Sequence, residues 1–216
     1  GPHRTQQSSS HPHQVLPDPA NKSLFVPDKG LDKVFTFQFD AENTTILPGN
    51  PPEVGAREGA GTRHISFLPN QTFAYVANEL DSTITTYQYN KANGALAPVQ
   101  IIPSIPETYT GNNTAAEIMV APSGKFVYVS NRGHNSIGIY AIDHEKGTLK
   151  PLGWESSQGK GPRFFAFDPA GKFLYAANEN SDTIVTFRIN QKTGKLTPTG
   201  QVIKTGSPVC IIFAQG

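Results

Sequence analysis

The sequence has a single cysteine, Cys210, and almost no net charge. One cysteine excludes an internal disulfide and leaves the redox compartment open. Lysine and arginine total 18 against 17 aspartate and glutamate, so no strong field would attract nucleic acid or an acidic membrane. No apolar run is long enough to span a bilayer, and no stretch keeps helical periodicity over several turns. We therefore expect neither nucleic acid nor membrane as a partner.

The sequence contains four copies of one repeat, each about 50 residues long. A proline anchors each copy, at spacings of 47 to 53 residues. An aromatic residue follows each anchor by six positions, Asp or Asn by nine, and a second aromatic by eighteen. Self-similarity at this period is typical of propellers, solenoids and arrays. The anchors are Pro19, Pro69, Pro122 and Pro169.

Each copy has the pattern of four short strands. In the third copy, residues 118–121, 126–130 and 136–142 are rich in β-branched and aromatic residues and are separated by turn residues, and a last strand starts near Leu149. A unit of roughly 40–50 residues with four strands matches one propeller blade. The sequence thus predicts an all-β fold, a β-propeller of four-stranded antiparallel blades. Glycine occupies the turn before the last strand in three copies, but Thr44 replaces it in the first, so we expect that turn to differ.

These patterns divide the chain as follows. Residues 1–12 are a connecting loop, and the innermost strands lie near 13–18, 63–68, 117–121 and 163–167. Residues 208–213 resemble a fifth innermost strand with no blade behind it, and Cys210 within it is expected to be a small buried hydrophobe. The expected blades span about 13–50, 63–105, 115–158 and 162–204.

The unpaired last strand suggests an incomplete ring. Four blades can close a ring, but a lone innermost strand needs outer strands from elsewhere. We therefore expect N-terminal blades outside this sequence, or a second half-ring, to complete the propeller, and we expect the isolated four blades to be inactive.

Charged residues recur where the blades converge. In a propeller the start of the first strand and the loop between the second and third strands share one rim of the channel. Three arginines on such a rim suit a phosphate or carboxylate, and His and Glu beside them could move a proton. Alternatively, the rim charges are solvated and pair with one another. The rim residues are His13, Arg63, Glu79, Glu117, Arg132, His134, Arg163 and Glu179.

Other constellations are weaker. His11, His13 and Asp18 could suggest a metal site, but the carboxylate lies past the strand, so we expect no metal and no cofactor. No serine nucleophile motif and no phosphate-binding glycine loop is present.

Six segments resemble the lactonase family of seven-bladed propellers, which includes 6-phosphogluconolactonases and fungal carboxymuconate lactonizing enzymes. The resemblance runs from about residue 11 to the end, and the segments match in order and spacing. It implies that these are the C-terminal four blades of seven, and that the family's proposed active-site residues fall on His13, Arg63, Glu79 and Arg132. Thr62 departs from the commoner proline. The segments are HPHQV at 11–15, GTRHISF at 61–67, NELDST at 78–83, NTAAEI at 113–118, SNRGHNSI at 130–137 and GKGPRFFAFDP at 159–169.

The resemblance implies a small anionic lactone or polycarboxylate as substrate, and two reactions remain open. A lactonase adds water to a cyclic ester: Arg63 and Arg132 would hold the acid group and polarise the carbonyl, while His13 or Glu79 activates water. Arg163, Glu117, His134 and Glu179 would then contact the substrate. A muconate lactonizing enzyme adds a carboxylate to an alkene.

A non-catalytic secreted glycoprotein is the alternative of another class. Four N-x-Ser/Thr sequons hint at secretion, although unused sequons in a cytoplasmic protein explain them equally well, so cytoplasmic and secreted or cell-wall locations both remain open. The sequons begin at Asn21, Asn43, Asn70 and Asn112.

Overall fold

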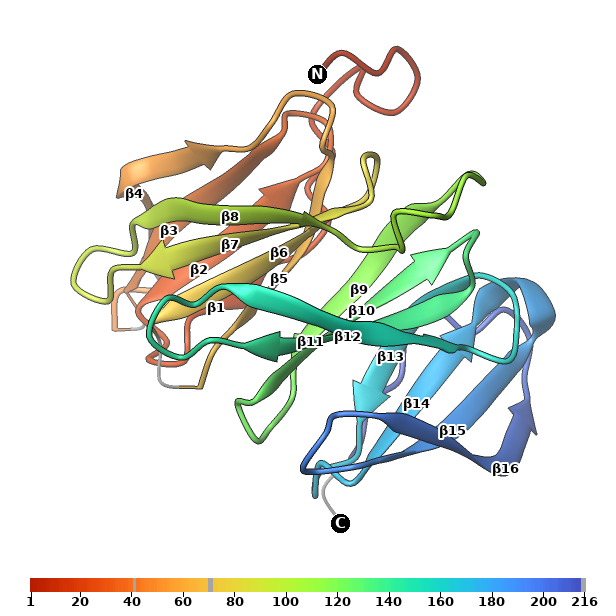
Figure 1. Cartoon of the computed structure of the whole chain (residues 1–216). Helices are drawn as coiled ribbons and strands as arrows, with labels where there is room; N and C mark the ends of the chain where they lie inside the picture. The colour runs from red at the N-terminus through yellow and green to blue at the C-terminus, as the bar shows by residue number, and fades with distance from the viewer. Residues whose placement is uncertain (41, 70–71, 215–216) are drawn as a thin grey trace.

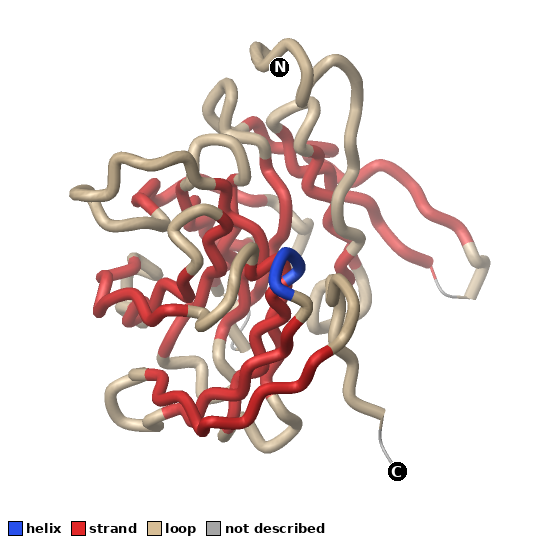
Figure 2. The backbone as a smooth tube through the Cα atoms, turned by 90° about the vertical axis from the view of Figure 1, so that its right-hand side faces the viewer, coloured by secondary structure: helices blue, strands red, loops and turns tan. Residues whose placement is uncertain are grey.

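The chain folds into four antiparallel sheets of four strands each, as the sequence predicts (Figure 1). The structure is a computed structural model that describes residues 1–40, 42–69 and 72–214. The Asn70 sequon lies outside these residues. Strands account for nearly all the regular structure in Figure 2, and the one helical segment of the described chain, the 3-10 turn η1 (Glu179–Ser181), is too short to cross a membrane.

Each sheet takes its strands in sequence order. The first blade contains β1 (Leu16–Pro17), β2 (Ser23–Asp28), β3 (Lys33–Asp40) and β4 (Thr45–Gly55). The second contains β5 (Thr62–Phe67), β6 (Phe73–Asn78), β7 (Thr83–Tyr89) and β8 (Leu96–Pro103). The third contains β9 (Thr114–Val120), β10 (Phe126–Arg132), β11 (Ser136–Ile142) and β12 (Leu149–Ser156). The fourth contains β13 (Pro162–Phe167), β14 (Phe173–Asn178), β15 (Thr183–Ile189) and β16 (Leu196–Lys204).

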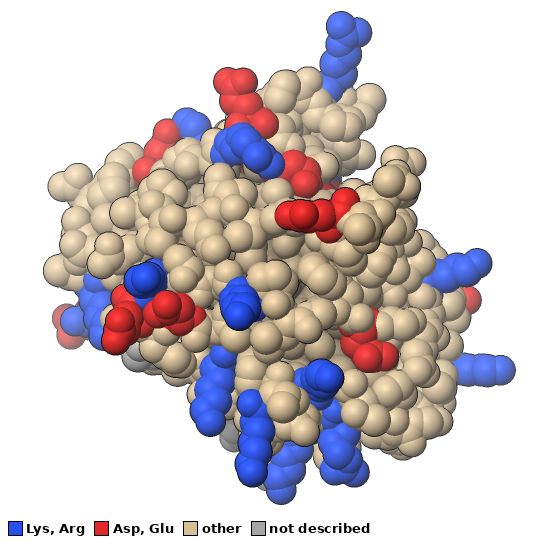
Figure 3. Space-filling view, in the orientation of Figure 1, with Lys and Arg blue, Asp and Glu red and all other residues tan. Residues whose placement is uncertain are grey.

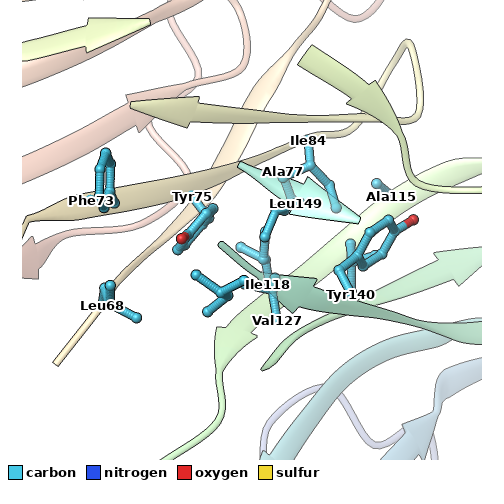
Figure 4. Close-up of a cluster of buried hydrophobic side chains, with 12 residues drawn as sticks. Leu68, Phe73, Tyr75, Ala77, Ile84, Ala115, Ile118, Val127, Tyr140 and Leu149 are labelled. Atoms are coloured by element: carbon cyan, nitrogen blue, oxygen red, sulfur yellow. The ribbon is translucent and has the colours of Figure 1, made fainter. Parts of the chain in front are cut away.

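Three hydrophobic clusters join neighbouring blades. Because side chains alternate across a strand, β6 sends Phe73 and Tyr75 into the cluster shared with the third blade (Figure 4) and Val76 into the cluster shared with the first. Both faces of β6 are therefore buried, and each large apolar side chain contributes roughly 1.5–3 kcal/mol. The predicted alternation of aromatic and small residues reflects this double burial.

The repeated tyrosine also joins the second blade to the third and the third blade to the fourth. Tyr75 donates its hydroxyl to the carbonyl of Gly147 at 3.1 Å, and Tyr128 does the same to Gly194 at 2.7 Å. Both acceptors belong to the turn before the last strand, where these glycines have φ of 71° and 73°. The repeat thus encodes contacts between blades as well as strands within them.

At its described residues the turn of the first blade shares two features with the other turns, although the sequence-based expectation is that it differs. Thr44 adopts the same left-handed conformation, with φ of 50°. Asp40 Oδ1 accepts from the backbone N–H groups of Glu42 and Asn43, as Asp143 Oδ1 does from Glu145 and Lys146 in the third blade. The carboxylate of Asp40 therefore specifies this turn without glycine.

Two further expectations need correction. The first blade ends later than predicted, because β4 continues to Gly55. Residues 208–213 form no strand, because none of the described strands pairs with them. Phe213 instead packs edge-on against Tyr175 of the last blade at 5.4 Å between ring centroids, and Cys210 is exposed rather than buried because no described strand covers this segment.

Charge is dispersed over the surface, in keeping with the near-neutral composition. Figure 3 shows acidic and basic side chains mixed over one face, with a group of lysines and arginines along its lower edge.

Candidate active site

An irregularity in the innermost strands positions the site. In β5 the register moves from Thr62↔Asn78 to His64↔Ala77, so Arg63 is an extra residue in the strand. Arg163 is the extra residue in β13 in the same way. A bulge of this kind redirects side chains and is common next to active sites. Here it places an arginine at the same point of two blades.

In the third blade, the register of β9 against β10 also shifts, between Ile118↔Val129 and Ala115↔Asn131. In the first blade, three residues from His13 onward lie opposite two of β2, between the pairs Pro12↔Asp28 and Leu16↔Phe25. All four blades therefore carry the irregularity at the predicted rim positions.

Glu79 is the centre of a buried ionic network. Its Oε2 accepts from Arg63 Nε at 2.9 Å and lies 3.1 Å from Arg132 Nη2, and its Oε1 lies 3.4 Å from Lys29 Nζ. Arg63 is 2% exposed and also donates to the carbonyl of Ala116 at 2.7 Å. Arg132 is more open and donates to the carbonyl of Ala115. The structure thus joins three of the four residues that the resemblance implicates.

The fourth, His13, belongs to a second chain of contacts. Its Nδ1 lies 3.0 Å from Nε2 of His64, and Nδ1 of His64 lies 3.0 Å from both carboxylate oxygens of Glu117. Glu117 is 2% exposed, and its Oε1 also accepts from the backbone N–H of Ile118. The buried carboxylate of Glu117 therefore faces His64 and the backbone rather than an open surface.

The two groups of contacts are electrostatically coupled. Burial, assisted by the positive charge of Arg63, lowers the pKa of His13 to about 3. Burial alone would raise the pKa of Glu79, but the charges of Arg132, Arg63 and Lys29 outweigh it and hold this pKa below its usual value. At neutral pH the site thus contains a neutral imidazole beside an ionised carboxylate clamped by cations.

The remaining rim residues lie further from this centre. Arg163 and Glu179 form a half-exposed pair at 3.6 Å. His134 contacts Ser136 Oγ at 2.6 Å and packs against Tyr109. The side chains of His11 and Asp18 bond elsewhere, and the described residues contain no group of three or more His, Cys, Asp or Glu able to hold a metal.

A pocket of about 400 Å³ adjoins Arg132 between the third and fourth blades. Its walls offer amide groups and a second cation, Lys160, which are donors and acceptors suited to hydroxyl groups and anions. Asn112, the start of one sequon, is on its wall, so a glycan there would obstruct it. The polar lining residues are Asn112, Asn113, Thr114, Arg132, Asn135, Lys160 and Asn180.

Sequence reasoning missed His64. It compared the residues six positions before each anchor proline, whereas His64 stands five before its anchor, in register with Gln14 and Glu117. The presence of polar residues at this position in three of the four copies was the available signal, since equivalent positions of neighbouring blades meet at the axis.

Comparison with known proteins agrees with this architecture. The chain is 34% identical to 6-phosphogluconolactonase of Bacillus subtilis over 171 residues, which are 78% of this chain and 47% of that protein. It is 36% identical to 6-phosphogluconolactonase of Yersinia pestis over 157 residues, which are 73% of this chain and 46% of that protein. The chain thus spans about half the length of these curated relatives.

Solved structures give the same result. The periplasmic gluconolactonase PpgL of Pseudomonas aeruginosa superposes with a TM-score of 0.88 at 33% identity, over 94% of this chain and 56% of that one. The family model described as lactonase, 7-bladed beta-propeller matches residues 1–213. This chain belongs to the lactonase family of seven-bladed β-propellers.

Proposed function

We propose that the protein hydrolyses a sugar-acid lactone, such as 6-phosphogluconolactone. The observation that carries this proposal is an arrangement in which His13 lies in the field of Arg63 and Glu79, while Arg132 contacts the same Glu79 and also lines an amide-lined pocket. A neutral imidazole can take a proton from water. The amides and Lys160 offer partners for the hydroxyl groups and anionic end of a sugar acid, and the names of the relatives support the same substrate class.

The proposed reaction uses the residues as follows. His13 Nε2 removes a proton from water as the oxygen adds to the lactone carbonyl. Arg132 stabilises the oxyanion that develops on the carbonyl oxygen. The ring C–O bond then breaks, and the departing alkoxide receives a proton, which leaves an open hydroxy acid.

The different exposure of Arg63, Arg132 and Arg163 indicates different roles for them. Arg63 is 2% exposed and its guanidinium is engaged by Glu79 and Ala116, so it acts through its charge. Arg132 and the half-exposed Arg163 are the cations in a position to meet an anion. Glu79 serves Arg63 and Arg132 as their counter-charge, which favours His13 over Glu79 as the base.

We also propose that these blades act within a larger ring. The chain covers 47% of its Bacillus subtilis relative, and Val209, Ile212 and Phe213 are exposed apolar residues that neighbouring strands would cover. Either further blades or a second half-ring would supply them. Intact mass and light scattering on the natural protein distinguish the two, and a monomer of these four blades alone that is fully active would contradict the proposal.

Turnover by the complete protein tests the chemistry. We expect 6-phosphogluconolactone to be opened faster than its spontaneous hydrolysis, and Arg132→Gln to reduce kcat/KM by 100-fold or more, about the loss of one oxyanion donor. The matched control is Arg57→Gln, which removes an exposed arginine that pairs with Asp81. Conversion of carboxymuconate to its lactone, with no lactone hydrolysis, would overturn the proposal in favour of a lactonizing enzyme.

A further inference from the structure

We propose that His64 and Glu117 form a proton relay behind His13, and that the proton taken from water ends as charge on His64 rather than on His13. This inference rests on the proposed function. It assigns a positioning role to two largely buried residues, whose side chains are 12% and 2% exposed, and it follows from the order of the hydrogen bonds.

The hydrogen bonds determine which ring nitrogens of His13 and His64 carry hydrogen before the reaction begins. The carboxylate of Glu117 has only acceptors, so Nδ1 of His64 carries the hydrogen that joins them at 3.0 Å. In a neutral His64 the other nitrogen, Nε2, is then an acceptor. The 3.0 Å contact with His13 requires one donor, so His13 carries its hydrogen on Nδ1. The lone pair on Nε2 of His13 therefore remains free to act as a base.

The surrounding charges explain why a relay is needed. The groups that act on His13 are Arg63, His64, Glu79 and Arg163. Burial and the two arginines oppose a positive charge on its ring, and Glu79 already neutralises Arg63 and Arg132. His64, in contrast, is joined to the buried carboxylate of Glu117, whose bonded partners in the described chain include no arginine or lysine, although the charges of Glu117 and Arg63 act on each other at longer range. A positive charge is thus better stabilised on the ring of His64 than on the ring of His13.

The transfer balances in protons and charge. Nε2 of His13 accepts the proton of the attacking water while Nδ1 of His13 gives its own proton to Nε2 of His64. His13 ends neutral with its hydrogen on Nε2, and His64 becomes an imidazolium paired with Glu117. When the alkoxide leaves, the reverse movement delivers a proton to it and restores the resting state.

Nitrogen-15 NMR of the histidine side chains in the complete protein tests this arrangement without any substrate. At pH 7 we expect the hydrogen on Nδ1 of both His13 and His64, with Nε2 of each bare. A hydrogen on Nε2 of His64 in the resting protein would reverse the donor order and overturn the proposal. This result does not depend on the reaction, so it stands apart from the test of the proposed function.

Two isosteric variants test the relay in turnover. Glu117→Gln still accepts from His64 but supplies no negative charge, and His64→Gln fills the site but cannot carry a proton through it. We expect each to lower kcat at least tenfold, with KM changed less than threefold. The controls are Glu53→Gln, from a half-exposed ion pair distant in sequence from the site, and His144→Gln, on an exposed turn.

The pH profile separates the relay from a merely structural effect. In Glu117→Gln the loss of kcat should grow as the pH falls from 8 to 6, because a relay without the carboxylate no longer takes the proton of water and the rate then depends on hydroxide. Folded variants with unmutated kcat and pH profile would overturn the relay while leaving lactone hydrolysis in place. Absence of hydrolysis in the unmutated protein would overturn the proposed function instead.

Discussion

Arg63 and Glu79 form a buried ion pair, in which Nε of an arginine that is 2% exposed donates to Oε2 of the carboxylate at 2.9 Å. Two charges withdrawn from water stabilise a protein little as a pair, but either one left alone is costly. The same pair lies beside His13, where the charge of Arg63 contributes to the low pKa. Site electrostatics and local stability therefore depend on the same residues.

Replacement of Arg63 tests this dependence. We expect Arg63→Leu to lower the free energy of unfolding by about 3 kcal/mol, because Glu79 keeps Arg132 and Lys29 but loses its most buried partner. The control Arg57→Leu removes an exposed arginine that pairs with Asp81, and should cost less than about 1 kcal/mol. Urea unfolding of both variants measures the difference, and equal losses would show that burial of Arg63 has no energetic weight.

The turn before the last strand gives a second prediction. Gly147 has φ of 71°, and a Cβ there would lie 2.2 Å from the ring of Phe73. Gly147→Ala should therefore destabilise the protein by more than about 1 kcal/mol, through strain and overlap together. Thr44→Gly at the equivalent turn of the first blade should stabilise it by about 1 kcal/mol, since it relieves strain without overlap. Thermal unfolding checks both, and shifts of the same sign would contradict the explanation.

The low pKa of His13 predicts how stability depends on pH. Its folded pKa of about 3 lies below the ordinary 6.5, so the unfolded chain binds this proton as pH falls through 6.5 while the native state does not. Stability is therefore lost below about pH 6.5. Between pH 7 and 5, His13→Asn should reduce this loss by about 1 kcal/mol, after allowance for screening of a partly exposed ring.

Between pH 7 and 5 the carboxylates with lowered pKa values do not yet affect the pH dependence of stability. Asp28 and Glu79, whose pKa values are also lowered, lose their contribution only at more acidic pH. Unfolding in urea at pH 7 and 5 gives the comparison, with His144→Asn on an exposed turn as the matched control. An unchanged pH dependence in His13→Asn would show that His13 is not held neutral.

The repeat predicted the fold well because every blade faces the same packing problem. Alternation in β6 and β10 reports side chains that enter two inter-blade clusters, and this pattern is visible without coordinates. Residues 208–213 form no strand here, and their pairing with further blades stays a prediction, because an apolar pattern cannot show whether a pairing partner is present. Thr44 was misjudged because the Asp40 carboxylate can specify the turn in place of glycine.

The sequence predicted which residues lie at the site, but not which of them contact one another. Its rim positions follow from the repeat, and Arg63, Glu79 and Arg132 do meet. The bulges cannot be seen in the sequence, however, and they bring Arg63 and His64 to the site as consecutive residues. Glu117 bonds to His64 and His134 contacts Ser136, and contact of either residue with substrate stays a prediction.

The rate of lactone opening by the complete protein with His13→Gln tests the central claim most directly. Glutamine preserves much of the shape of the ring but cannot accept a proton, so we expect kcat for 6-phosphogluconolactone to fall at least 100-fold at pH 7 while the protein stays folded. A folded His13→Gln protein that opens the lactone at the unmutated rate would contradict His13 as the base and, with it, the account of this site.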